Sequence, residues 1–128
     1  MERSIIKGLL IVHAVITFAA AMVLIIIPDA IPGMVNIRLS PDAYLLCYFL
    51  GAAEIGIAYL SFFSIRIKER QALRIVVTGF IIFHLATGAL ETFAIIHDHL
   101  SLKIIGNIVL RIIMSILFYY YGIVKLKE

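Results

Sequence analysis

The chain is poor in the residue types that stabilise soluble domains. Only 15% of its 128 residues are charged, whereas about a quarter are charged in an ordinary soluble domain. It has one cysteine, Cys47, so neither an intramolecular disulfide nor a Cys-x-x-Cys redox pair can form within it. The dithiol quinone reductases, which are also small helical bundles, are therefore excluded. We expect Cys47 to be a small packing residue.

Sequence motifs of catalysis are also missing. There is no Gly-rich phosphate loop, no nucleophile elbow and no His-Glu-x-x-His. The sequence therefore predicts no catalytic residues and no metal site, and a non-enzymatic role is favoured. The net charge of +3 comes from basic residues that flank apolar runs, so we expect the lipid bilayer, and no nucleic acid, as a partner.

Long apolar runs dominate the chain, since 63% of its residues are hydrophobic. A helix that crosses a bilayer needs about 20 apolar residues. Four stretches satisfy this requirement: residues 5–27, 43–64, 72–96 and 102–124. The connections over 65–71 and 97–101 are short, so we expect the helices they join to be neighbours. The sequence predicts an all-α fold, a four-transmembrane-helix up-down-up-down bundle, as a single integral membrane domain over residues 1–128.

The basic residues are distributed unequally around these runs. Only Arg38 and Lys103 flank one side. The other side has eight: Arg3, Lys7, Arg66, Lys68, Arg70, Arg74, Lys125 and Lys127. Because cytoplasmic loops carry the excess of Lys and Arg, we expect both termini in the cytoplasm and the chain in the cell (inner or plasma) membrane. The first run ends at Pro28-Asp29 without a cleavage site, so we expect it to remain as an anchor helix.

All three prolines lie in the connection between the first two runs, residues 28–41. Its apolar side chains indicate a segment that lies along the membrane surface or folds back over the bundle. Ser40-Pro41-Asp42 predicts the start of the second helix. Serine can cap a helix, proline suits the first turn, and aspartate complements the helix dipole.

Three charged residues lie inside the apolar runs and away from their ends: Glu54, Glu91 and Arg111. A charge at the centre of a membrane helix costs roughly 2.5–3.5 kcal/mol, so these side chains are expected to face the interior. Helical spacing supports this expectation, because each run has one stripe of small or polar residues. The stripes contain His13, Thr17 and Ala20; Cys47, Gly51, Glu54, Ala58 and Ser61; His84, Thr87, Gly88 and Glu91; and Asn107, Arg111 and Ser115.

The depths of these residues predict two layers. At about 1.5 Å per residue, Glu91 and Asn107 lie about 8 Å from the outer helix ends, and Arg111 lies about 14 Å from them. Because side chains lean toward the N-terminus of their helix, Arg111 and Glu91 should converge on adjacent helices. Glu54 should lie within reach of Arg111.

A second layer, of His13 and His84, is expected below the first. Two carboxylates facing one arginine leave an excess negative charge, which a proton on Glu54 or on a histidine would cancel. Such a group could carry protons, or it could belong to a static polar plug that only sets helix register. Two histidines on different helices could also ligate a b-type haem. The alternative is that they are hydrogen-bonded core residues.

The layout resembles the small four-helix membrane proteins of the DoxX-like and related uncharacterised bacterial or archaeal groups. Three segments carry the resemblance: Ser40-Pro41-Asp42-Ala43, Leu50-Gly51-Ala52-Ala53 with Gly56, and Phe83-His84-Leu85 followed by Gly88-Ala89. Those groups offer no settled catalytic residues to carry over. Some members are subunits of membrane redox systems, so the resemblance implies a quinone- or oxidase-associated role.

Three functions remain open from the sequence. The polar site, formed by Glu54, Glu91, Arg111, His84, His13 and Asn107, could bind a lipid-like or quinone ligand in a membrane redox system. The chain could instead be a non-catalytic accessory subunit of a larger membrane complex. It could also be a small proton-coupled transporter that uses Glu54, which would demand an oligomer. A homo-oligomer is compatible with the small residues of Ala52-x-x-x-Gly56.

Overall fold

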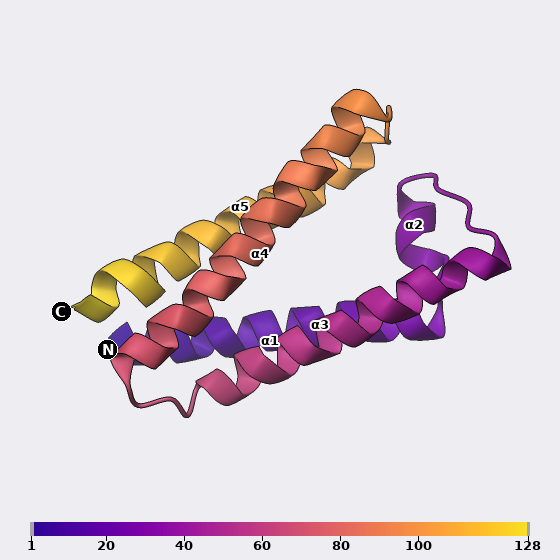
Figure 1. Ribbon diagram of the computed structural model, residues 1–128. Coiled ribbons are helices and arrows are strands. Elements are labelled where there is room, and N and C mark those ends of the chain that lie inside the picture. The colour runs from indigo at the N-terminus through magenta and orange to yellow at the C-terminus, as the bar shows by residue number, and fades with distance from the viewer. Residues whose placement is uncertain (1, 128) are drawn as a thin grey trace. The chain divides into compact units, whose positions relative to one another are not determined.

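Helices account for nearly all of the secondary structure in the computed structural model, which describes residues 2–127 (Figure 1). The elements are α1 (Glu2–Ile26), α2 (Ala30–Met34), η1 (Pro41–Ala43), α3 (Tyr44–Ser64), α4 (Arg70–His97), η2 (Leu102–Ile104), α5 (Ile105–Leu117), the π-helical η3 (Phe118–Val124) and η4 (Lys125–Lys127). No strand occurs in this part of the chain. The predicted all-α fold class is confirmed.

Within the described residues, four helical segments are long and apolar enough to cross a membrane. They are Arg3–Ile26, Pro41–Ser64, Arg70–His97 and Leu102–Val124. Each coincides with a predicted run to within a few residues, because about 20 consecutive apolar residues determine both the length and the position of a spanning helix. By length and composition, the chain is therefore a multipass membrane protein.

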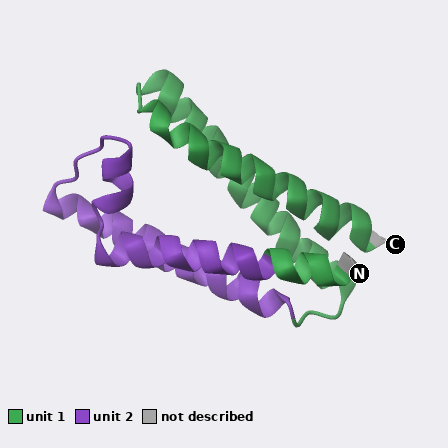
Figure 2. Ribbon diagram, turned by 180° about the vertical axis from the view of Figure 1, so that it is seen from behind, with its two compact units in different colours: residues 1–9, 66–128 green, residues 10–65 purple. Residues whose placement is uncertain are grey.

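The chain divides into two compact units (Figure 2). Unit 2, residues 10–65, pairs most of α1 with α3. The two helices are antiparallel, since Ser61 at the end of α3 bonds to Leu10, and Gly51 lies beside Ala21. A Cβ atom on Gly51 would lie 3.2 Å from the Ala21 carbonyl oxygen and 2.7 Å from Ile25 Cγ1. The absence of a side chain at Gly51 therefore permits the close approach of α1 and α3.

Unit 1, residues 1–9 and 66–128, pairs α4 with α5 and η3. Leu73, Val77 and Phe80 of α4 are buried, as are Phe118 and Gly122 of η3. The Phe80 and Phe118 rings lie 5.6 Å apart between centroids. Helix packing in membranes depends on such close contacts, because lipid tails are as apolar as the side chains themselves.

The end of α2, in unit 2, is closed by backbone hydrogen bonds. Asn36 has a φ of 64° and follows the last residues of α2. The amide groups of Asn36 and Ile37 donate to the carbonyls of Gly33 (3.1 Å) and Pro32 (3.0 Å), which is the Schellman pattern.

The start of α3 differs in one detail from the prediction. Ser40 occupies the N-cap position of η1, Pro41 lies in its first turn and Asp42 follows, as expected. The Ser40 side chain, however, makes no capping hydrogen bond. The predicted serine cap is therefore wrong. The connection is held instead by Tyr44, whose hydroxyl donates to Asp29 Oδ2.

Candidate functional site

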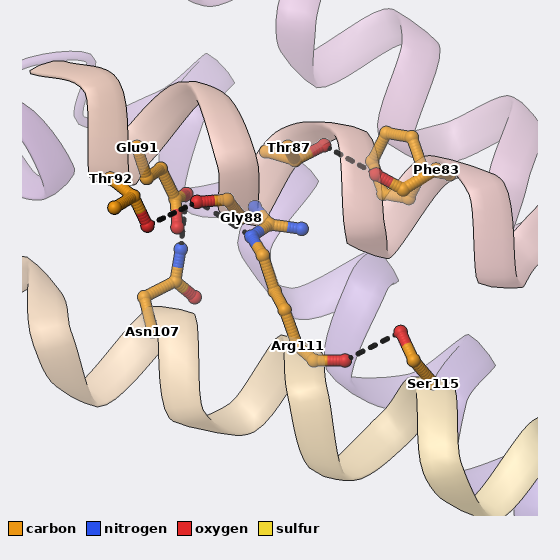
Figure 3. Close-up of polar contacts among 8 residues, drawn as sticks. All are labelled: Phe83, Thr87, Gly88, Glu91, Thr92, Asn107, Arg111 and Ser115. Carbon is orange, nitrogen blue, oxygen red and sulfur yellow. Dashed lines mark hydrogen bonds and ion pairs between the residues drawn. The ribbon is translucent and has the colours of Figure 1, made fainter.

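A polar cluster of Glu91, Asn107 and Arg111 joins the two membrane-spanning helices of unit 1 (Figure 3). Glu91 projects from α4, and the other two side chains project from α5. One carboxylate oxygen, Glu91 Oε1, accepts hydrogen bonds from Asn107 Nδ2 (2.6 Å) and Arg111 Nε (3.1 Å). The Arg111–Glu91 contact is an ion pair, so the predicted convergence of these residues is confirmed.

The cluster forms because Gly88 of α4 has no side chain, which leaves room for the aliphatic part of the Arg111 side chain. A Cβ atom on Gly88 would lie 4.0 Å from both Cβ and Cδ of Arg111, so this aliphatic part packs directly against this turn of α4. The guanidinium then lies beside the Gly88 turn, with Glu91 on one side and Phe83 on the other (Figure 3). Its Cζ atom is 5.6 Å from the centroid of the Phe83 ring, within the range of a cation–π contact.

The hydroxyl groups around the cluster do not compete for it. Thr87 donates to the Phe83 carbonyl (2.7 Å), and Ser115 donates to the Arg111 carbonyl (2.9 Å). Both bonds run to the residue four positions earlier on the same helix, as hydroxyls commonly do in apolar helices. These hydroxyl groups therefore make their hydrogen bonds within their own helices. The polar contact between the helices is made by Glu91, Asn107 and Arg111.

Much of the hydrogen-bonding capacity of the cluster is unused. Within residues 2–127, the structure shows no hydrogen bond from the two terminal amino groups of Arg111. Glu91 Oε2 is buried and also has no hydrogen-bond partner among the described residues. The exposed fractions of the Arg111 and Glu91 side chains are only 15% and 14%. Donors and an acceptor of opposite charge thus lie next to each other in a membrane-spanning segment.

The sequence prediction for this site was correct for the pair and partly wrong for its surroundings. Asn107 was expected to face inward, but it is exposed, although its amide reaches Glu91. The sequence does not predict Phe83 as a site residue, because it is one of many apolar side chains in this helix. Its spacing with Thr87 and Glu91, at steps of four, could have placed it on the cluster face.

His84 lies on α4 in the same unit and is buried. Its ring is stacked on that of Phe118, with 6.3 Å between centroids and 18° between planes. Its ring also lies near Phe83, with centroids 5.5 Å apart. His84 is therefore packed among aromatic rings toward the middle of α4.

The other predicted residues, His13 and Glu54, belong to unit 2. His13 is buried, and its Nδ1 lies 2.9 Å from Ser61 Oγ. Ser61 donates its only hydroxyl hydrogen to the Leu10 carbonyl (2.9 Å), since a carbonyl can only accept. Nδ1 of His13 must therefore carry a proton and donate to Ser61. In the neutral ring, the lone pair then resides on Nε2, the tautomer that metal-ligating histidines often adopt.

Glu54 is half-buried on the face of α3 that also carries the buried Gly51, Ala58 and Ser61. The predicted polar stripe of α3 is thereby confirmed. Two finer hypotheses stay predictions: that Glu54 joins the Arg111 layer, and that His13 and His84 together ligate a haem. Among the described residues, no group of three or more His, Cys, Asp or Glu side chains could hold a metal ion.

The fold and the cluster define the class of protein: an α-helical multipass membrane protein with an interhelical ion pair in one of its two helical units. Comparisons of the chain with protein-family models, with curated proteins and with solved structures found no match. The resemblance to DoxX-like proteins therefore stays a prediction.

Proposed function

We propose that the chain binds the polar head of a lipid-like molecule, such as a quinone, at the cluster of Glu91, Asn107 and Arg111. The observation that carries this proposal is the unused capacity of the ion pair. The two terminal amino groups of Arg111 donate to no described residue, and Glu91 Oε2 accepts from none. An arginine in a membrane helix is retained against a cost of roughly 2.5–3.5 kcal/mol, which favours a functional role.

The chemistry of the cluster fits a head group with carbonyl or hydroxyl oxygens. A carbonyl oxygen would accept from the Arg111 amino groups, and a hydroxyl group, as in a quinol, would donate to Glu91 Oε2. Hydrogen bonds to charged groups are about twice as strong as neutral ones. Phe83 supplies an apolar ring beside the guanidinium, against which a flat head group or the start of an acyl tail can pack. This arrangement supports binding in a membrane redox system and assigns no catalytic step to the chain.

The test is retention of a bound lipid-like molecule after purification. The full chain is extracted in a mild detergent, and native mass spectrometry with solvent extraction identifies what remains bound. We expect the wild-type protein to retain such a molecule, and we expect Arg111→Gln to lower its retention by about tenfold or more, because a hydrogen bond to a charged group is lost. Arg111→Lys, which keeps the charge but lacks the planar guanidinium, should give an intermediate retention of the ligand.

Arg38→Gln is the matched control, since it removes the same side chain from an exposed position in unit 2. It should retain the ligand as the wild type does. If no lipid-like molecule is retained or recovered on adding quinone, the cluster is a structural lock and the proposed function is wrong. Equal retention by the wild type and Arg111→Gln would place any bound lipid elsewhere.

We propose in addition that both termini and the loop of residues 65–71 face the cytoplasm of the cell. The guanidinium of Arg3 donates to the carbonyls of Ile67 (3.0 Å) and Lys68 (2.8 Å). This contact within unit 1 supports a single basic end, which the excess of Lys and Arg would orient inward.

The proposed orientation can be tested by cysteine labelling in a Cys47→Ser background. An impermeant maleimide should label Lys103→Cys on intact cells, and it should label Lys68→Cys only after the cells are opened. The reverse pattern would show the opposite orientation.

A further inference from the structure

One face of α4 carries an open groove at the end of the helix opposite to the Glu91 cluster. Its volume is about 490 Å³, and its lining comes from one face of the helix: Gln71, Arg74, Ile75, Thr78, Gly79 and Ile82. This face is distinct from the buried face of α4, which carries Leu73, Val77 and Phe80. The groove therefore lies beside the buried face of α4 and not on it, within unit 1.

The groove changes in chemistry along its length. Its first turn has a half-buried guanidinium, Arg74, and an exposed amide, Gln71. Its far end is the exposed apolar side chain of Ile82. Between them, Gly79 has open space beside it, since a Cβ atom there would meet nothing within 4 Å. The groove is thus polar and positive at one end and apolar at the other.

The dimensions of the groove suit one acyl chain. From Gln71 to Ile82 the helix rises about 16 Å, close to half of the roughly 30 Å hydrocarbon thickness of a bilayer. The polar end would then lie at the head-group level, and the apolar end would lie near the bilayer midplane. A molecule that matches this gradient has a polar head and a tail that spans one leaflet.

The charge around the polar end favours an anionic head group. Residues 66–74 contain four basic residues, Arg66, Lys68, Arg70 and Arg74, against one acidic residue, Glu69. Basic clusters next to a membrane helix attract anionic lipids, by about fivefold in affinity for each basic residue near the surface. We propose that the groove binds an anionic glycerophospholipid, with its phosphate on Arg74 and Gln71 and one acyl chain along Ile75, Gly79 and Ile82.

A lipid fits this face better than a second copy of the chain does. Helices that pack closely in membranes use small residues four positions apart. The residues four positions from Gly79 are Ile75 and Phe83, both large. The site is also separate from the proposed ligand cluster, because Arg74 and Glu91 are about 25 Å apart along the helix.

The test compares two lipids with identical acyl chains. The purified full chain is titrated with phosphatidylglycerol or phosphatidylcholine, and native mass spectrometry counts the bound molecules. We expect the wild type to prefer phosphatidylglycerol, and we expect Arg74→Gln to reduce this preference by about fivefold. Gly79→Leu should reduce binding of both lipids, since the leucine side chain would occupy the open space along the groove without a clash.

Two controls match these variants. Arg38→Gln removes an exposed arginine in unit 2, and Gly56→Leu adds the same side chain at an exposed glycine with nothing within 4 Å. Both should bind the lipids as the wild type does. Equal binding of the two lipids by the wild type, or equal effects of Arg74→Gln and Arg38→Gln, would overturn the proposal.

A shift from dimer to monomer in Gly79→Leu, with lipid binding unchanged, would assign the groove to a second copy of the chain and would also overturn the proposal. The outcome is independent of the Arg111 experiment, because Arg74→Gln should leave retention at the Glu91 cluster unchanged.

Discussion

Replacing Arg111 by glutamine is expected to destabilise the protein by about 3 kcal/mol, the usual scale for removing one partner of a buried ion pair. Arg111 Nε donates to Glu91 Oε1, and both side chains are largely buried. Without Arg111, the carboxylate keeps only the Asn107 hydrogen bond. An uncompensated charge then remains in a membrane-spanning segment, where it costs roughly 2.5–3.5 kcal/mol.

The double variant Glu91→Gln/Arg111→Gln should recover most of this loss, because two neutral amides carry no unpaired charge. Replacing both members of a buried ion pair is often close to neutral. The free energies of unfolding of the wild type, the two single variants and the double variant form a double-mutant cycle. They can be measured by denaturant titration in detergent micelles, followed by the helical circular dichroism signal.

Arg38→Gln serves as the control for this cycle and should change the free energy of unfolding by less than about 0.5 kcal/mol, as exposed substitutions usually do. A double variant as unstable as Arg111→Gln would contradict the explanation by charge. It would show that Arg111 acts through its packing against Gly88 and Phe83. The cycle therefore separates the contribution of the paired charges from the contribution of the packing of Arg111.

The transmembrane helices were predictable because one large energetic requirement determines them, the bonding of backbone groups inside a bilayer. An apolar run of about 20 residues has few alternatives in a bilayer, since every backbone group must be bonded within the helix. The ends of the helices were less predictable, because they depend on local bonds of similar strength. At Ser40 the side chain makes no cap, and the nearby Tyr44–Asp29 hydrogen bond holds the segment instead.

The Glu91–Arg111 pair was predictable from two simple rules. Helical spacing gives the shared face, and the lean of side chains toward the N-terminus brings the two together across antiparallel helices. The exposure of Asn107 could not be predicted this way, because spacing gives a direction around the axis and not the extent of coverage. Asn107 lies one turn before Arg111 and shares its face, yet it is exposed while the Arg111 side chain is largely buried.

The role of Gly122 was also beyond the sequence rules. The segment Phe118–Val124 is π-helical, and a π-helix changes the number of residues per turn. A spacing of 3.6 residues per turn therefore no longer predicts which residues share a face in this segment. Only the structure shows that Gly122 is buried against Val77. This contact leads to a second prediction with a large expected effect.

Gly122→Ala is expected to destabilise the protein by about 1–3 kcal/mol, the range for overpacking a close contact. A Cβ atom on Gly122 would lie 2.5 Å from Val77 Cγ1 and 3.2 Å from Val77 Cβ. Val77 is completely buried, and its β-branched side chain has one strongly preferred rotamer in a helix. It cannot turn away, so the α4–η3 packing must open instead.

Val77→Ala should relieve this clash, because it removes the Cγ atoms that the new methyl group would meet. The Gly122→Ala/Val77→Ala variant should therefore be more stable than Gly122→Ala, even though truncating a buried valine alone is destabilising.

Gly56→Ala is the matched control. A Cβ atom there meets nothing within 4 Å, so the better helix propensity of alanine should leave stability unchanged or raise it by up to about 1 kcal/mol. The measurement is again the free energy of unfolding in micelles. If Gly122→Ala were as stable as Gly56→Ala, η3 would be free to move away from α4. The close α4–η3 contact would then be a consequence of the fold and not one of the interactions that hold unit 1 together.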